Sequence, residues 1–191
     1  MPRRKTKKRN TIKKIIKSMI NNNIETKTAV HNYTTIEVSN VGVNHDITAL
    51  AQGLQQQDRV GNQIKLTSFR LKGCFYSDYT HDLVRVIIYI PKNVNELLAT
   101  STTPTDPLDQ DKYTILSDRL IPLSNQGSPV KPYNKVILFN KGLRNGLNVH
   151  YTTNLASSCT KNQLMVYMCS GSGASPHPKF SGYWRFYFKD A

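Results

Sequence analysis

Acidic residues are absent from the first 24 positions of the chain, whereas lysine and arginine are abundant there. The 191-residue sequence has 26 Lys and Arg against 12 Asp and Glu, for a net charge of +14. Cationic blocks typically bind polyanions, so we predict a nucleic-acid-binding arm over residues 1–24. It holds nine of the basic residues: Arg3, Arg4, Lys5, Lys7, Lys8, Arg9, Lys13, Lys14 and Lys17.

Long apolar runs are also missing. No stretch approaches the roughly 20 apolar residues that a membrane-spanning helix needs, and no apolar segment of a secretory signal is present, so we expect no membrane partner. Cysteine is scarce: Cys74, Cys159 and Cys169 are odd in number and show no CxxC spacing. This argues against a disulfide framework and favours buried free thiols in a reducing compartment.

The sequence carries no recognisable catalytic signature. HExxH, the Walker loop, the GxSxG elbow and the dinucleotide fingerprint are all absent, and the five histidines are scattered singly. Asp106, Asp109 and Asp111 lack the glycine and terminal glutamate of an EF-hand loop, so a solvated loop is favoured over a cation site. An enzyme of the cupin type would need clustered His and Glu ligands. We therefore do not expect an enzyme.

Residues 11–24, "TIKKIIKSMINNNI", have the pattern of a short amphipathic helix. Apolar side chains recur at helical spacing, and the lysines lie off the stripe. The stripe can pack on its own body, on a membrane or on a partner helix. It lacks Trp and Phe, which disfavours the membrane, and we expect the same helix of neighbouring subunits as its partner. The inter-subunit stripe is Ile12, Ile15, Ile16, Met19 and Ile20.

After the arm the periodicity changes from helix to strand. The pattern predicts eight strands with almost no helix, apart from one or two turns at 94–100. Eight strands in two packed antiparallel sheets favour a jelly roll over an immunoglobulin sandwich, so the fold class is an all-β, eight-stranded antiparallel jelly-roll sandwich. The predicted strands are 32–41, 63–79, 82–93, 113–123, 130–140, 147–153, 162–171 and 180–190.

Two of these strands have notable patterns. In 63–79 the apolar face switches between Leu66 and Phe69, which predicts a β-bulge or a change of packing environment. In "KFSGYWRFYFKD" (179–190), basic and aromatic residues interleave as in single-stranded nucleic-acid platforms. Simple alternation also explains it, with Trp184, Phe186 and Phe188 on one face and Tyr183, Arg185 and Tyr187 on the other. We prefer core packing for Trp184 and Phe186.

Four basic residues of the predicted strands are further candidates for phosphate contact. Alternation places Arg70 and Lys72 on one face, which would suit a strip that follows a nucleic-acid backbone. The alternative is ion pairing to Asp78, Asp82 or solvent. The four candidates are Lys65, Arg70, Lys72 and Arg85.

Taken in order, these segments resemble the single jelly-roll capsid proteins of viruses. "RVGNQIKLTSFRLKG" (59–73) followed by "LVRVIIYIPKN" (83–93) is similar to the capsid proteins of circovirus-like single-stranded DNA viruses. "IIKSMINNNIETK" (15–27), "DKYTILSDRLI" (111–121) and the final "KDA" resemble more closely the coat protein type of satellite tobacco necrosis virus. Each motif is weak alone, and the resemblance lies in their succession along the chain.

The resemblance implies a coat protein with an arm at 1–24 and a jelly-roll shell domain at 25–191. Copies would form a small icosahedral T=1 shell of about 60 subunits around a single-stranded RNA or DNA genome. The protein would reside in the virion, and in the host cytoplasm or nucleus during assembly. The satellite-virus type also implies structural calcium between subunits, with Glu25 and Asp190 in matching positions.

The main alternative is a cellular β-domain that binds single-stranded nucleic acid by aromatic stacking. Both hypotheses place cations against phosphates, so binding should weaken steeply with salt as counterions are released. Particle size separates them, because a shell is megadalton-scale and a binding module is a small oligomer.

Overall fold

Nine strands make up nearly all the regular structure of the described residues. The computed structural model describes residue 12 and residues 25–77, 81–94, 96–124, 133–171, 173 and 175–190. The strands are β1 (Lys27–Glu37), β2 (Val43–Asp46), β3 (Gln63–Ser77), β4 (His81–Pro91), β5 (Tyr113–Ser124), β6 (Tyr133–Tyr151), β7 (Cys159–Lys161), β8 (Met165–Ser170) and β9 (Lys179–Asp190).

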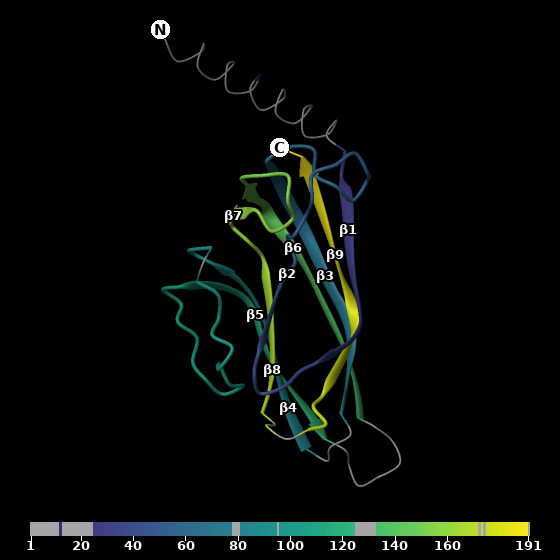
Figure 1. The fold of residues 1–191 in the computed structure, drawn as a ribbon, viewed down its shortest axis with the longest axis vertical. Coiled ribbons are helices and arrows are strands. Elements are labelled where there is room, and N and C mark those ends of the chain that lie inside the picture. Colours follow the sequence, from purple (N-terminus) through teal and green to yellow (C-terminus); the bar gives the residue numbers. More distant parts are fainter. Residues whose placement is uncertain are drawn as a thin grey trace.

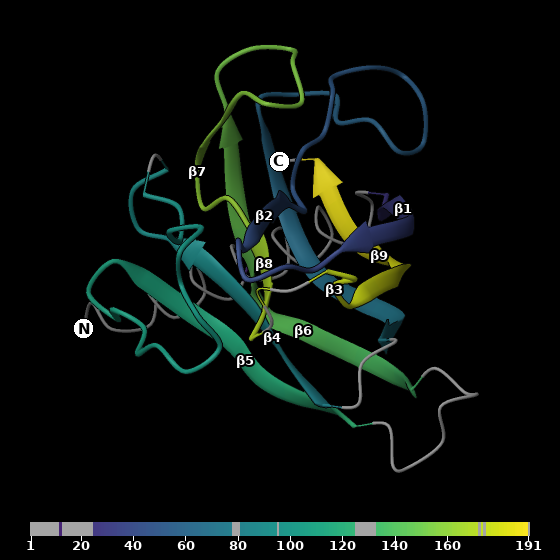
Figure 2. The same cartoon turned by 60° about the horizontal axis from the view of Figure 1, so that its bottom comes forward.

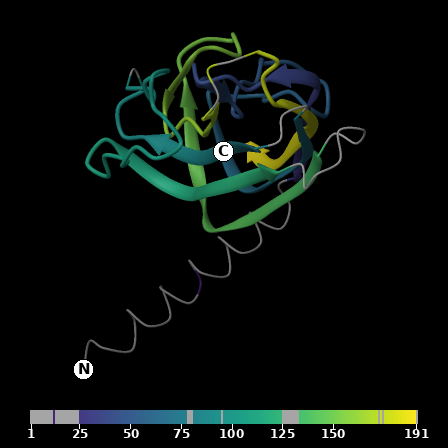
Figure 3. The ribbon, with the colours of Figure 1, turned by 90° about the horizontal axis from the view of Figure 1, so that it is seen from below.

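The strands form two sheets whose order defines the fold. One sheet has the order β1-β9-β3-β6-β7 and the other β2-β8-β4-β5, and all paired strands are antiparallel. With the three-residue β7 set aside, the eight remaining strands in chain order lie as 1-8-3-6 and 2-7-4-5, which is the strand order of a jelly roll. Figure 3, seen along the long axis, shows the two layers. The predicted fold class is confirmed.

The strand boundaries differ from the sequence prediction in several places, and the three-residue strand β7 was not predicted. β1 begins five residues earlier than expected, and the polar strand β2, "VNHD", lies between the strands predicted at 32–41 and 63–79. β6 joins the two strands predicted at 130–140 and 147–153 into one irregular strand of 19 residues. The described residues of 94–100 form no helix. The differences in the strands arise where pairing with a distant strand, rather than local pattern, determines the backbone.

The predicted bulge in β3 is confirmed, and it decides which side chains share a face. The register shifts between Leu66 and Ser68 against both neighbouring strands, and Thr67 is an extra residue relative to β9. The apolar residues before and after Thr67 are therefore all buried between the sheets, although their parity differs. The Thr67 hydroxyl donates a hydrogen bond to the carbonyl of Tyr187 (2.9 Å) and ties the bulge to β9.

The main core lies between the two sheets and is rich in aromatic rings. Trp184, Phe186 and Phe188 of β9 are fully buried, as the alternation predicts. The rings of Phe75 and Phe180 lie 4.9 Å apart between centroids. Burying such side chains contributes about 1.5–3 kcal/mol each, so this layer is the principal source of stability.

A second apolar cluster lies on the outer face of the four-stranded sheet. It is covered by the connection from β4 to β5, residues 92–112, which Figures 1 and 2 show beside this sheet. Tyr89 donates to Asn44 Oδ1 (2.7 Å) and accepts from the Leu98 amide (3.1 Å). Strand β8 is consequently buried on both faces. The cluster comprises Ile87, Tyr89, Leu98, Tyr113, Met165, Tyr167 and Cys169.

The three cysteines are free thiols, as predicted. Cys159 and Cys169 are buried, and burial raises the pKa of each thiol to about 11. Cys74 is half-buried, and burial raises its pKa as well. Thiols with raised pKa values are poor nucleophiles at neutral pH, which fits a packing role.

Candidate nucleic-acid interface

Most of the predicted arm lies outside the described residues. This applies to all nine arm cations and to Ile15, Ile16, Met19 and Ile20 of the stripe, whose roles remain predictions. Ile12 is described, and it is 55 % exposed. The continuous description begins at Glu25, two residues before β1, which is an edge strand of the five-stranded sheet. The arm therefore joins the body at this sheet.

The structure brings Lys65, Arg70 and Lys72 together on the outer face of the five-stranded sheet. Arg70 and Lys72 alternate with buried neighbours, as predicted. Lys65 joins them only because the extra residue Thr67 reverses the parity of the strand. Lys72 is exposed, and the other two cations are half-exposed.

Strand β9 adds two cations directly opposite those of β3. Arg185 pairs in register with Arg70, and Lys189 with Lys65. The Cβ atoms of such opposite residues are about 5 Å apart, and like charges at this spacing are destabilising. Alternation in the sequence places Arg185 between two tyrosines, but neither Arg185 nor Lys189 was predicted as a binding residue, because the β3–β9 register cannot be read from either strand alone. Together these cations form a basic face, which consists of Lys65, Arg70, Lys72, Arg185 and Lys189.

Most of the basic face is not neutralised by the protein itself. Among the described residues no carboxylate forms an ion pair with Lys65, Arg70, Lys72 or Arg185. The Nε of Arg185 is buried and has no hydrogen-bond partner in the described chain. The whole five-stranded sheet has eleven Lys and Arg in its strands and only Glu37 and Asp190 as acids. The electrostatics of this face therefore favour an anionic ligand.

Lys65 is positioned by a glycine on the neighbouring strand. Gly146 adopts a φ of 69°, in the left-handed region, where β6 departs from its register with β3. A Cβ at this position would lie 2.4 Å from Cε of Lys65, so only glycine leaves room for the lysine side chain to cross β6.

Arg85 does not belong to this face, contrary to the prediction. It lies on the outer side of the four-stranded sheet, with a side chain only 7 % exposed. Its Nε and Nη2 donate to Oδ1 and Oδ2 of Asp118 (2.8 and 2.6 Å), and Nη1 donates to the carbonyls of Thr103 and Asp106. Hydrogen bonding to Asp118 raises the pKa of the guanidinium. Arg85 thus anchors the 92–112 connection and is withdrawn as a phosphate contact.

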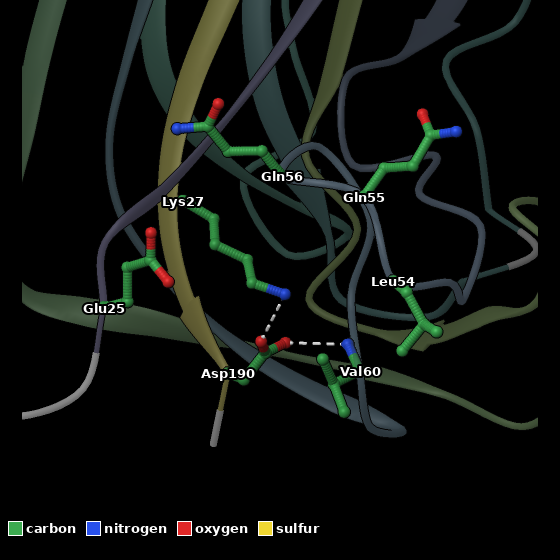
Figure 4. A pocket seen from close by; sticks show the side chains of 7 residues that line it. All are labelled: Glu25, Lys27, Leu54, Gln55, Gln56, Val60 and Asp190. Carbon is green, nitrogen blue, oxygen red and sulfur yellow. Dashed lines mark hydrogen bonds and ion pairs between the residues drawn. The ribbon is translucent and has the colours of Figure 1, made fainter.

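The predicted calcium residues line one open pocket at the end of the sandwich. Figure 4 shows Glu25 and Asp190 there, with Lys27 pointing at Asp190. The Lys27 ammonium lies 2.9 Å from Asp190 Oδ2 and donates to the Asp58 carbonyl (3.0 Å), while the Val60 amide donates to Asp190 Oδ1 (3.0 Å). Both carboxylate oxygens of Asp190 are therefore engaged.

This arrangement does not favour calcium, which needs six to eight oxygen ligands. A lysine ammonium occupies the position beside Asp190, and in the described part of the chain no three His, Cys, Asp or Glu side chains gather as a metal site would require. Calcium remains a prediction from the resemblance.

The carboxylates of Asp106 and Asp109 accept hydrogen bonds from the amides of Thr103 (2.6 Å) and Asp111 (2.9 Å), which makes them turn residues of the 92–112 connection.

Comparison with known proteins adds little to this geometry. No protein-family model and no curated protein matches the sequence. Among solved structures, a chain from Desmodium yellow mottle tymovirus is similar at 12% identity, covering 88% of this chain and 82% of that one, with a TM-score of 0.38. A score this low does not establish a shared fold, so the jelly-roll assignment rests on the strand order. No helix in the described residues has the length and hydrophobicity to cross a membrane.

Proposed function

We propose that the chain is a viral coat protein that assembles into a small icosahedral shell and packages a single-stranded nucleic acid. The observation that carries the proposal is the one-sided charge of the body. The sheet to which the basic arm is joined carries the basic face, whereas the outer face of the other sheet carries an apolar cluster and the internally paired Arg85 and is covered by the 92–112 connection. A shell subunit needs this polarity, because only one of its sides meets the packaged polyanion.

The mechanism is charge neutralisation without a catalytic step. Arm and basic face hold phosphates, release the counterions of the nucleic acid and relieve the repulsion between opposite cations such as Arg70 and Arg185. The partners are copies of the same chain, about 60 in a T=1 shell, and the genome, which is RNA or DNA. The protein would reside in the virion after assembly in the host cytoplasm or nucleus.

Particle size tests the proposal most simply. Purified full-length protein, expressed with cellular nucleic acid present, should elute in sizing chromatography as a megadalton-scale particle and appear as uniform shells by electron microscopy. Recovery of only monomers or small oligomers would contradict a coat function.

Deletion of residues 1–10 tests whether the arm, rather than the β body, packages the nucleic acid. The deletion removes six of the nine arm cations, and we expect the β body to stay folded while less nucleic acid is packaged. The ratio of absorbance at 260 and 280 nm measures the content. Normally filled particles would show that the arm is not the packaging element.

The apolar stripe of the arm has its own test. Ile16→Asp with Met19→Asp should impair assembly without lowering the melting temperature of the dissociated subunit, because the proposed partners of the stripe are helices of other copies. A large drop in melting temperature would instead place the stripe in the body's own core.

The alternative function is a cellular module for single-stranded nucleic acid. The observation that favours it is the alternation of Tyr183, Arg185 and Tyr187 on an open sheet face. Such a module would bind oligonucleotides with the same salt dependence but remain a small oligomer, so the sizing experiment separates the two functions.

A further inference from the structure

We infer that the outer face of the five-stranded sheet is a second nucleic-acid site, in which Tyr183 and Tyr187 stack bases of a single strand while the basic face holds its phosphates. The inference deepens the proposed function, because it adds a site on the body to the predicted arm and specifies the ligand as single-stranded.

The geometry places rings and cations in alternation. Trp184, Phe186 and Phe188 are fully buried, so the residues between them project from the opposite side of β9. Tyr183 and Tyr187 are therefore on the outer face, separated by Arg185 and roughly 13 Å apart along the strand. Across β3, Tyr183 faces Lys72 and Tyr187 faces Ser68. Tyr183 therefore faces a cation, and Tyr187 lies between Arg185 and Lys189 on the same face of β9.

The surrounding charge selects an anionic ligand. Arg70 and Arg185 are directly opposite each other, without an ion pair to any described carboxylate. The guanidinium carbon of Arg185 lies over the ring of Tyr183, 5.7 Å from its centre, so cation and ring are in cation–π contact. Repulsion between the two arginines is relieved when a phosphate lies between them.

The rings select a single strand over other polyanions. Bases of a duplex are stacked inside the helix and cannot reach a flat sheet, whereas unpaired bases stack on aromatic side chains whatever their sequence. The core does not require these two tyrosines, since the inner face of β9 is filled by the buried rings. A binding role explains why aromatic residues also occupy the outer face.

The first experiment measures how full-length protein binds a labelled oligo(dT) as a function of salt. Arg185→Gln should reduce the slope of log affinity against log salt by roughly 0.7 for each phosphate that the variant no longer neutralises. Lys112→Gln, in the connection over the other sheet, removes the same charge and should leave the slope unchanged. Equal slopes for Arg185→Gln and wild type would overturn the role of Arg185 in holding a phosphate.

The second experiment separates stacking from charge. Tyr187→Leu should weaken oligo(dT) binding by roughly 5- to 150-fold, the range for one stacked base, without changing the salt slope. Tyr187→Phe keeps the ring and should restore binding. Heparin, a polyanion without bases, should bind all three proteins equally. A parallel loss of heparin binding, or no loss of oligo(dT) binding, would overturn the stacking role.

The outcomes of these experiments distinguish failure of the single-strand site from failure of the coat function. If shells form and fill normally but neither Arg185→Gln nor Tyr187→Leu changes oligo(dT) binding as expected, the single-strand site is contradicted and the proposed coat function is not. Small oligomers whose variants behave as expected would remove the coat function and keep the single-strand site. Tighter binding of a duplex than of oligo(dT) would contradict the inference directly.

Discussion

The outer faces of the two sheets are built on opposite principles. The strands of the five-stranded sheet contain eleven basic and two acidic residues, whereas those of the four-stranded sheet contain two basic and three acidic residues. The first sheet leaves Lys72 in solvent, and the second buries Tyr89 and Tyr167 under its own chain. The outer face of the five-stranded sheet is therefore suited to an anionic ligand, whereas that of the four-stranded sheet packs against the protein's own chain.

Two arginines show what the difference means. Arg85 has a bidentate carboxylate partner and two carbonyl acceptors, so its charge serves the structure. Arg185 has another arginine opposite, an unpartnered Nε and only a cation–π contact with Tyr183, so no described carboxylate neutralises its charge. Unneutralised charge retained against local stability is typical of a functional surface.

The largest expected effect is a loss of stability when Arg85, which anchors the 92–112 connection, is removed. Arg85→Ala leaves Asp118 and the carbonyls of the 92–112 connection without their donor, and we expect a loss of about 3 kcal/mol in the free energy of unfolding. Arg70→Ala, on the basic face, should change it by less than about 0.5 kcal/mol. Urea unfolding of both variants tests the contrast. Similar losses would show that both arginines are structural.

A smaller loss of stability is expected when the hydrogen bonds of the Tyr89 hydroxyl beneath the 92–112 connection are removed. Tyr89→Phe removes the hydroxyl that donates to Asn44 and accepts from the Leu98 amide, which leaves the buried amide and the half-buried Asn44 Oδ1 without this partner. We expect a loss of about 1–2 kcal/mol, measured by thermal or urea unfolding. Burial raises the pKa of Tyr89 to about 12, so the hydroxyl stays protonated and this loss should not vary between about pH 6 and 9. An unchanged stability would mean that the connection is held by apolar contacts alone.

A still smaller effect lies where the edge strands β1 and β2 meet the core. His31 stacks on Phe186, and His45 lies 5.4 Å from Trp184 between ring centres. Burial lowers the pKa of both histidines below 6.5, with Asp46 opposing the shift at His31. The unfolded chain therefore takes up protons first, so stability present above pH 6.5 should fall as the pH drops below it.

The contribution of His31 and His45 to the pH dependence of stability can be separated from that of the other titratable groups. Melting temperatures at about pH 7.5 and pH 5.5 should differ more for the wild type than for a variant carrying His31→Phe and His45→Phe. Burial raises the pKa of Asp46, which acts in the opposite direction at lower pH. An equal difference in both proteins would assign the acid sensitivity to other groups.

Local pattern predicted the core better than it predicted the site. Alternation in β9 placed Trp184 and Phe186 inside, and the parity switch in β3 indicated the bulge at Thr67. The same pattern could not show that Arg70 lies opposite Arg185, because register is a property of two strands 115 residues apart. Nor could it show that Arg85 pairs with Asp118, since β4 and β5 are joined by a connection of unpredictable path.

The most direct test of the account is the stability of Arg185→Glu with and without single-stranded DNA. Without DNA, the introduced glutamate faces Arg70 and replaces repulsion by attraction, so the free energy of unfolding should rise by about 0.2–1 kcal/mol over wild type. With saturating oligo(dT), the wild type should gain more through binding and become the more stable protein. A variant that is less stable than wild type without DNA, or that gains as much from oligo(dT), would contradict the claim that these cations are retained for the nucleic acid.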